Sequence, residues 1–300
     1  MPAAAESIVY IRGSDASLWI ARPDGTGARK IGDGPFAWPS QANNGTIVAQ
    51  GPGKRAPDGT RGGEIWVFTA AGRLDHRISA PADYSTLDCP TFAPQHIHIS
   101  PDGSKIAYDT WMCNHFMSVW TPATSRGLNW PKQKAGQEGT IVPSWIGNDR
   151  LLLSYVSRPV DAQEFALYSP GAGDNALTGW FSDAGWASGW RAFASSDGKR
   201  IAVVEDDAAD RLGTPARVAI KLYAAEGSSD APTTICETNI PFGPGFANVS
   251  PSFSPNHKRL LFGLPDGIHV AEIGERPNCA AIARAPLILP GATQGFWSKF

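Results

Sequence analysis

The stretch Ile99-Ser-Pro-Asp-Gly-Ser-Lys-Ile-Ala-Tyr108 decides the fold, because in it a tight Pro-Asp-Gly turn joins two short apolar runs. This is the chemistry of a β-hairpin. The same frame recurs at residues 194–203 and 253–262, and weaker copies lie at residues 41–49 and 145–153. The copies follow one another at irregular intervals of roughly 40 to 60 residues, as expected for four-stranded units with loops of variable length. The sequence therefore predicts an array of small antiparallel sheets.

Each copy is followed by a strand of alternating polarity, and an outer strand then leads to the next copy. The alternating strands lie at residues 64–68, 117–120, 165–168, 218–223 and 268–271. These strands account for five units. The two chain ends supply a sixth, because Gly295–Phe300 resembles an innermost strand and Ser7–Arg12 resembles the strand that follows the turn.

Joining the two ends completes a sheet and removes the open edge that an unclosed ring would expose. We therefore predict an all-β, six-bladed β-propeller with four-stranded antiparallel blades, spanning residues 1–300 as a single domain. Its closing blade is shared by the N- and C-terminal strands. A β-sandwich with coincidental turns is the alternative, but it gives no reason for the two ends to complement each other.

The composition agrees with many short strands joined by turns. The 300 residues include 32 Gly and 25 Pro, spread along the chain, with 42% hydrophobic and 18% charged residues. Such a chain can bury a substantial core. The formal net charge of −2 gives no basic field for nucleic acid, and no run of about 18 apolar residues predicts a membrane-spanning helix. We expect a monomer that does not bind nucleic acid and does not span a membrane. The first residues, Met-Pro-Ala-Ala-Ala-Glu, lack the basic and apolar regions of a signal peptide.

The repeated frame resembles the WD40-like PD40 repeat of TolB-type propellers, and the resemblance covers nearly the whole chain. It implies the propeller fold. It leaves the function open, because the family includes periplasmic scaffold proteins, peptidase propellers and polysaccharide lyases. TolB itself has an additional N-terminal α/β domain for which these 300 residues have no room, which argues against a TolB role in binding a peptidoglycan-associated lipoprotein.

The Asp-Gly turns lie on one face of the predicted ring, which we call the turn face, and longer segments lie on the opposite, loop face. These segments are residues 51–63, 79–94, 109–115, 179–189, 205–216 and 239–248. Elaborated loops on one face favour recognition there. Aromatic and charged side chains in these segments stack on sugars or form a patch for a protein. The expected ligand-binding residues are Tyr84, Asp88, Trp111, His115, Trp186, Trp190, Arg191 and Phe246. The alternative is that the aromatic residues plug the channel and cover loop backbone.

The four cysteines allow two disulfides. Cys89 and Cys113 fall in loop-face segments of one blade, where a disulfide would join two long loops. Cys236 and Cys279 fall on the expected outer strands of successive blades, where outer strands diverge, so their pairing is less secure. An even number of cysteines favours an oxidising, extracytoplasmic compartment, periplasmic or secreted. Buried free cysteines are the alternative.

Histidines suggest a metal site. His96 and His98 alternate and should share one face of an innermost strand, and His115 follows in the loop-face segment. His96, His115 and Asp88 are therefore candidate ligands of a divalent metal ion, since imidazole and carboxylate suit Mn, Zn or Fe. Propeller lyases that share this repeat use a His-ligated metal. Alternating histidines also pack between blades and bond to backbone.

No Gly-x-Ser-x-Gly, phosphate-binding loop or paired-Cys zinc motif is present in the sequence. The first hypothesis is therefore a non-enzymatic recognition or scaffold propeller that binds a protein or glycan on the loop face and at the channel mouth. The alternative is a metal-assisted polysaccharide lyase or hydrolase, in which Arg191 neutralises a uronate carboxylate and a histidine abstracts the proton.

Overall fold

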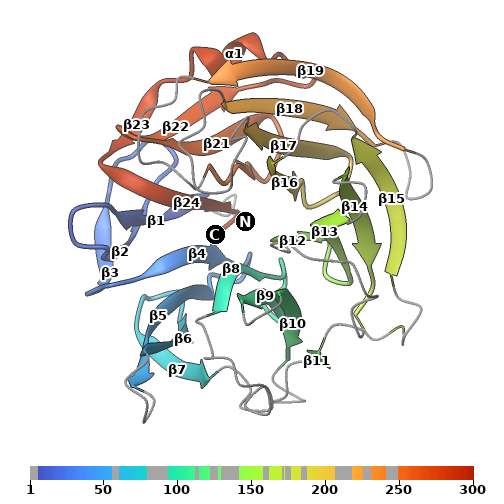
Figure 1. Ribbon diagram of the computed structural model, residues 1–300. Helices are drawn as coiled ribbons and strands as arrows, with labels where there is room; N and C mark the ends of the chain where they lie inside the picture. The colour runs from blue at the N-terminus through green and yellow to red at the C-terminus, as the bar shows by residue number, and fades with distance from the viewer. Residues whose placement is uncertain are drawn as a thin grey trace.

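The computed structural model contains six four-stranded antiparallel sheets arranged in a ring around a central channel (Figure 1). This confirms the predicted six-bladed β-propeller. The structure describes residues 6–55, 61–79, 94–111, 115–121, 128–129, 142–157, 162–170, 172, 177–183, 188–206, 218–225, 231–240 and 249–300.

The closing blade, blade 1, joins the two ends of the chain as predicted. From the channel outwards it contains β24 (Ala292–Ser298), β1 (Ser7–Arg12), β2 (Leu18–Ala21) and β3 (Arg29–Gly32). β1 pairs with β24 from Ser7↔Ser298 to Arg12↔Ala292. Blade 2 contains β4 (Ala37–Gln41), β5 (Ile47–Arg55), β6 (Arg61–Phe68) and β7 (Leu74–Ser79). Blade 3 contains β8 (Pro94–Ile99), β9 (Ile106–Trp111), β10 (His115–Trp120) and β11 (Leu128–Asn129).

The other three blades follow in chain order. Blade 4 contains β12 (Val142–Ile146), β13 (Arg150–Ser157), β14 (Ala162–Tyr168) and β15 (Leu177–Asp183). Blade 5 contains β16 (Ser188–Ala194), β17 (Arg200–Asp206), β18 (Val218–Ala224) and β19 (Thr233–Ile240). Blade 6 contains β20 (Ser252–Phe253), β21 (Arg259–Leu264), β22 (Gly267–Glu272) and β23 (Leu287–Pro290).

The core lies between the blades. Successive residues of β1 point to opposite faces of the sheet, so Ile8 and Tyr10 pack against blade 6 while Val9 and Ile11 pack against blade 2. All four side chains are buried. Because a neighbouring blade covers each face, the middle strands are mostly apolar. Each apolar side chain removed from water contributes about 1.5–3 kcal/mol.

Three of the repeated turns share one hydrogen-bonded scaffold. In blade 3, Ser100 Oγ donates to Asp102 Oδ1 (2.7 Å) and accepts from Lys105 N (2.9 Å). Blade 5 repeats these bonds with Ser195, Asp197 and Arg200, and blade 6 with Ser254, Asn256 and Arg259. The scaffold explains why the Ser-x-Asp/Asn frame recurs in the sequence.

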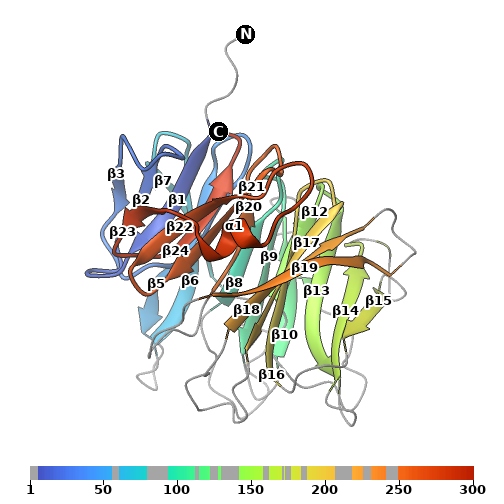
Figure 2. The same cartoon turned by 90° about the horizontal axis from the view of Figure 1, so that it is seen from above.

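Figure 2 shows the ring from the side, and the start of β1 and the C-terminal end of the chain lie on the turn face. The prediction that residues 51–63 form a loop is wrong in part. β5 runs to Arg55 and β6 begins at Arg61, and Gly51↔Glu64 and Pro52↔Gly63 are paired. These paired residues extend the middle strands of blade 2 towards the loop face.

One short helix, α1 (Ala280–Ala283), lies between β22 and β23. Among the described residues, no helix is long and apolar enough to span a membrane.

Candidate functional site

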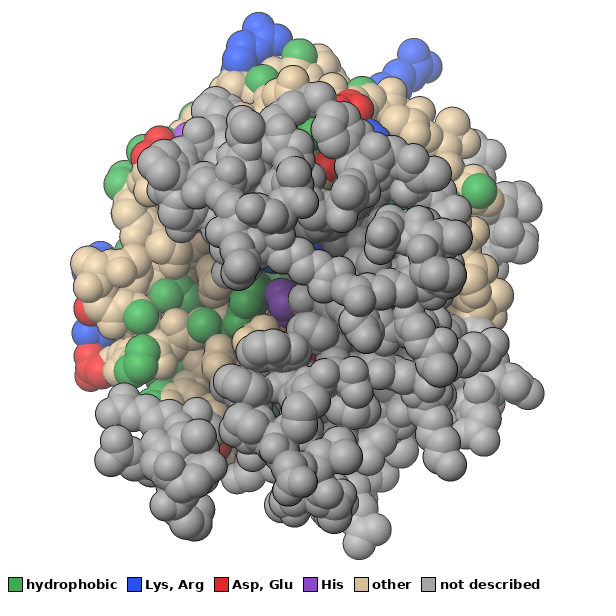
Figure 3. All heavy atoms as spheres, viewed as in Figure 1, with side chains coloured by type: hydrophobic (Ala, Val, Ile, Leu, Met, Phe, Trp, Pro, Cys, Tyr) green, Lys and Arg blue, Asp and Glu red, His purple; other side chains and the backbone are tan. Residues whose placement is uncertain are grey.

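The central channel holds a cavity of about 120 Å³ that is lined by the innermost segments of all six blades. Its lining runs from Trp38 and His96 to the turns at Asn43, Pro101 and Ser196. Figure 3 views the ring from the side opposite the chain ends, and in the described part of its centre a histidine lies beside hydrophobic side chains. The channel is therefore a concave, mostly apolar site.

Two neighbouring inner strands are bulged at the same level of the channel. The register shifts in β4 between Ala37 and Ser40, and in β8 between Gln95 and His98. Trp38 and His96 lie within these bulges with φ of 53° and 46°, a region that non-glycine residues rarely adopt. Each such residue costs of the order of 1–3 kcal/mol and persists only where its surroundings hold it.

The side chains of these two residues meet. The ring centroids of Trp38 and His96 are 4.2 Å apart. Trp38 N donates to Gln294 Oε1 of β24 (2.7 Å), which fixes the bulge from the closing blade. Strained backbone at adjacent bulges that brings two aromatic side chains together is typical of binding sites.

His96 carries a polar atom that has no partner in the described part of the chain. The side chain is buried, and its Nδ1 donates to Asp109 Oδ1 at 2.9 Å, because an ionised carboxylate only accepts. Its Nε2 has no hydrogen-bond partner among the described residues. Leaving such an atom unsatisfied costs about 1–3 kcal/mol. A ligand group that bonds to Nε2 would recover this free energy.

The expectation that His96 and His98 share one face of their strand is wrong, because the bulge between Gln95 and His98 breaks the alternation. His98 Nδ1 donates to the Pro143 carbonyl of the next blade (3.3 Å), and its ring lies 4.8 Å from that of Phe296. Burial lowers the pKa of His98 to about 4, although the bond to Pro143 opposes this shift. His98 is therefore neutral at physiological pH.

Alternate blades link their inner strands through the same serine contact. Ser40 Oγ accepts from Ile99 N (3.2 Å), Ser144 Oγ from Ala194 N (2.9 Å), and Ser252 Oγ from Trp297 N (3.0 Å). Each serine follows a proline. The residues before the three donors are equivalent by position and all line the cavity: His98, Phe193 and Phe296.

Sequence reasoning missed Trp38, Asp109 and Gln294, because bulges leave no clear sequence pattern. The Pro-Ser pairs at residues 39–40, 143–144 and 251–252 are a readable signal. They mark the inner strands of every second blade and would have pointed to the channel-lining residues.

The predicted loop-face residues fall mostly outside the described side chains. Tyr84, Asp88, Trp186 and Phe246 lie outside the described residues, and Trp111, His115 and Trp190 are described only by their strands, β9, β10 and β16. Arg191 lies on β16, paired with Val204 and partly exposed. The described residues that line the cavity do not include it. The loop-face ligand site stays a prediction.

The metal hypothesis also stays a prediction. In the described residues no group of three or more His, Cys, Asp or Glu side chains is placed to hold a metal ion. Asp88 and the side chain of His115 lie outside this description. Of the proposed ligands, His96 is the one whose side chain is described, and its Nδ1 bonds to Asp109.

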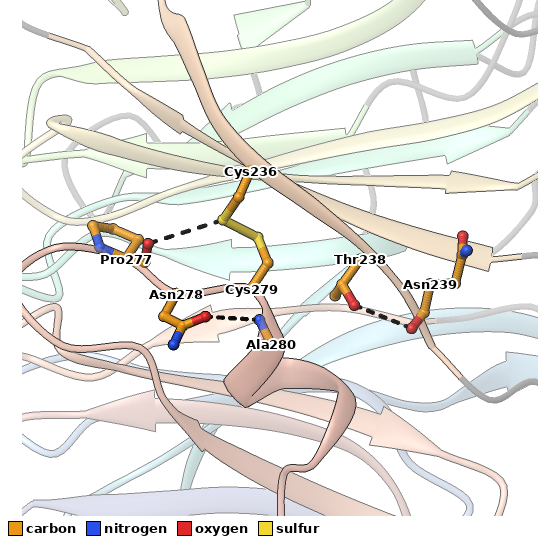
Figure 4. Close-up of a disulfide and its surroundings, with 7 residues drawn as sticks. All are labelled: Cys236, Thr238, Asn239, Pro277, Asn278, Cys279 and Ala280. Carbon is orange, nitrogen blue, oxygen red and sulfur yellow. Dashed lines mark hydrogen bonds between the residues drawn. A yellow bond between two sulfur atoms is a disulfide. The ribbon is translucent and has the colours of Figure 1, made fainter.

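Cys236 and Cys279 form a disulfide with a Cα–Cα distance of 5.9 Å (Figure 4). Cys236 lies on outer strand β19 of blade 5, as expected. The placement of Cys279 on an outer strand is wrong, because it precedes α1 in the segment between β22 and β23. This segment packs α1 against β19, which brings the two cysteines together although outer strands diverge. Cys89 and Cys113 lie outside the described residues.

No protein-family model matches the sequence, and no curated protein matches it. Among solved structures the chain is similar to TolB from Acinetobacter baumannii, with a TM-score of 0.64 and 14% identity over 99% of this chain and 67% of that one. A Bacteroides uniformis protein described as a candidate 6-phosphogluconolactonase has a TM-score of 0.54 and 12% identity over 98% and 99% of the two chains. The Cps50 (Swd1) β-propeller domain from Myceliophteria thermophila has a TM-score of 0.51 and 10% identity over 92% and 85%. At these identities the similarities show the propeller fold.

Proposed function

We propose that this protein is a recognition propeller whose central channel receives one side chain or chain end of a protein partner. The observation that carries the proposal is the buried His96 Nε2, which has no partner among the described residues and belongs to a channel-lining residue. Asp109 fixes the orientation of the His96 ring, and Trp38 covers one side of it. Because Nε2 is fully buried, a ligand group reaches it by displacing part of the lining, and it then gains one polar contact and one aromatic surface.

The cavity size favours a protein over a glycan. At about 120 Å³ the cavity is smaller than the roughly 300–1,000 Å³ of pockets that enclose a whole small molecule. A protein needs only one anchoring group in such a pocket, with the remaining contacts made around its mouth. A glycan is the alternative partner, bound by the loop-face aromatic residues.

The proposal assigns binding, and no catalytic step, to His96 and Trp38. The alternative, a metal-assisted lyase or hydrolase, would use His96, His115 and Arg191, with Asp88 as a further metal ligand. No observation of the described channel favours it over recognition.

The Cys236–Cys279 disulfide supports an extracytoplasmic location, periplasmic or secreted, because disulfides persist in oxidising compartments. The partner would then be an extracytoplasmic protein.

Panning a displayed random-peptide library on the protein, followed by calorimetric titration of a selected peptide, tests the proposal. The variants are His96→Asn and Trp38→Asn, since asparagine tolerates the left-handed backbone at both positions. We expect each to weaken binding at least tenfold. The matched control is His76→Asn, at an exposed histidine on β7, which should leave the affinity unchanged.

Two outcomes would contradict the proposal. Peptides that bind the His96→Asn and Trp38→Asn variants as tightly as the wild type would place recognition outside the channel. A glycan array that yields ligands sensitive to both substitutions, with no such peptide, would replace the protein partner by a carbohydrate.

A further inference from the structure

The turns of blades 5 and 6 are neighbours on the turn face, and each differs from the Ser-Pro-Asp-Gly turn of blade 3. The left-handed turn position holds glycine in three blades, Gly45, Gly103 and Gly198, with φ between 71° and 87°, but blade 6 has His257 there with φ of 59°. The second frame position holds Pro101 in blade 3 and Pro255 in blade 6, but Asn43 in blade 2 and Ser196 in blade 5. Where a chain breaks a local rule that its other repeats keep, a function is the expected reason.

The two departing side chains contact each other. Ser196 Oγ lies 3.0 Å from His257 Nε2, and Asp197 Oδ2 lies 3.2 Å from His257 Nδ1. Since the carboxylate accepts from Nδ1–H, the neutral ring accepts the Ser196 hydroxyl proton at Nε2. This order of nucleophile, base and orienting carboxylate is that of serine hydrolases.

The backbone holds the three residues in place. Asp197 Oδ1 accepts from Ser195 Oγ (2.7 Å) and Lys199 N (3.0 Å), which leaves Oδ2 for the histidine. Arg200 donates to the His257 carbonyl, and the Ser196 carbonyl accepts from Gly147 N at 2.8 Å. The contact therefore joins two anchored turns.

We propose that Ser196, His257 and Asp197 form a nucleophilic site that hydrolyses short-chain carboxylic esters. This site shares the channel cavity with the proposed recognition site but uses neither His96 nor Trp38. Ser196 is exposed and also lines the channel cavity. Its hydroxyl is thus open to a substrate whose acyl group enters the channel mouth.

The reaction balances with water as the second reactant. Ser196 Oγ forms a bond to the ester carbonyl carbon, and its proton passes to His257 Nε2. The C–O bond to the alcohol then breaks, and the leaving alkoxide takes that proton. Water, deprotonated by His257, attacks the acyl-serine, releasing the carboxylic acid and restoring the Ser196 hydroxyl.

The surroundings keep His257 available as a base. Burial lowers the pKa of His257, Arg200 and Lys199 lower it further, and Asp197 opposes them. Glu275 lies at the edge of this group, 2.6 Å from Lys258 and 3.8 Å from Arg200. The neutral base is therefore the main form at pH 7, and the hydrolysis rate should rise with pH as His257 loses its proton.

Initial rates of p-nitrophenyl acetate hydrolysis by the purified protein test the proposal. We expect Ser196→Ala and Ser196→Pro to lower the rate at least tenfold, as should His257→Gly. The Pro and Gly variants restore residues that other blades carry, so they should fold. p-Nitrophenyl octanoate should react at least ten times more slowly than the acetate, because the cavity is small.

Asp197→Asn separates positioning from folding. Asn256 makes the same two turn bonds in blade 6, so the turn should persist while the charge that orients His257 is lost. We expect at least a tenfold loss of rate, with a changed pH profile. The control is His76→Gln. His76 also contacts a carboxylate, that of Asp75, but both side chains are exposed on β7, and the substitution should leave the rate unchanged. A rate that survives Ser196→Ala or Ser196→Pro, or that falls equally with His76→Gln, would overturn the proposal.

Discussion

Two junctions of the ring, between blades 3 and 4 and between blades 5 and 6, share one contact. In both, a basic side chain donates to a backbone carbonyl of the next blade, but the residues around this contact differ. Lys105 follows the blade 3 turn, and its Nζ donates to the Asn148 carbonyl of blade 4 at 2.7 Å. Arg200 holds the equivalent position in blade 5 and donates to the Gly274 and Glu275 carbonyls of blade 6, at 2.9 and 2.7 Å.

The difference lies in the residues around this shared contact. The blade 3–4 junction keeps the proline and glycine of the repeated turn and adds His98 in the channel. At the blade 5–6 junction, Ser196 takes the place of the proline in the blade 5 turn and His257 that of the glycine in the blade 6 turn. The Cys236–Cys279 disulfide also joins these two blades. Residues that recur at these junctions hold the ring together. Positions where one junction carries a different residue are the candidates for a chemical function.

Removing the disulfide should weaken the blade 5–6 junction most. The bond closes a loop with a sequence separation of 43 residues, so chain entropy alone gives about 4 kcal/mol. We expect Cys236→Ala/Cys279→Ala to lower the free energy of unfolding by up to this amount in urea titrations. An unchanged midpoint and slope would show that the rest of the junction already holds the two blades together.

Acid should act on the blade 3–4 junction through His98. His98 has a pKa of about 4 when folded against about 6.5 when unfolded, so the unfolded state binds more protons between these values. Its contribution to stability is present above pH 6.5 and is lost as the pH falls towards 4, by up to about 3 kcal/mol. Urea titrations at pH 7.5 and 4.5 measure it.

His98→Phe is the matched variant, since Phe193 and Phe296 occupy the equivalent position in other blades. It should lose part of the acid-dependent destabilisation. An identical pH dependence in the wild type and the variant would assign the effect to another group.

Removing the basic residue that both junctions share should lower the free energy of unfolding by different amounts at the two junctions. Arg200→Met removes charge-assisted bonds to carbonyls in blade 6, and we expect a loss of about 2–3 kcal/mol. Lys105→Met removes bonds to the Asn148 carbonyl and the exposed Asp149, with an expected loss of about 1 kcal/mol. Equal losses in thermal or urea unfolding would mean that the junctions are equivalent after all.

The smallest expected changes in stability come from substitutions at the left-handed turn position. Gly103→Ala and His257→Gly should change the free energy of unfolding in opposite directions. Gly103→Ala should cost about 1 kcal/mol, because φ is 81° there. His257→Gly should stabilise the protein by about 0.5–1 kcal/mol for the same reason. If His257→Gly destabilises the fold instead, the side-chain contacts of His257 stabilise the protein by more than its left-handed backbone costs.

The ring, its six blades and the shared closing blade were predictable from the sequence. Turn chemistry and strand alternation are local, and the complementary patterns of Ser7–Arg12 and Gly295–Phe300 required no knowledge of packing. The extent of the strands was harder to predict. Gly51 and Pro52 indicated a loop, yet they continue in register with β6, because pairing with a neighbouring strand overrides local propensity.

The site was less predictable because it depends on contacts between blades. Alternation placed His96 and His98 on one face, and no local pattern announces the bulge that separates them. The contact of Ser196 with His257 joins residues 61 positions apart, but aligning the turns would have exposed both as departures from the frame. The position of Cys279 beside β19 depends on how α1 packs and has no sequence signature.

Labelling with a fluorophosphonate tests the central claim most directly. Attack by Ser196 Oγ forms a Ser–O–P bond and expels fluoride, which leaves an adduct that mass spectrometry of proteolytic fragments can locate. We expect the adduct on Ser196 in the wild type and at least a tenfold slower reaction in His257→Gly. Labelling spread over several exposed serines, or labelling of Ser196 at the same rate in His257→Gly, would contradict the claim that the departures at this junction form a reactive site.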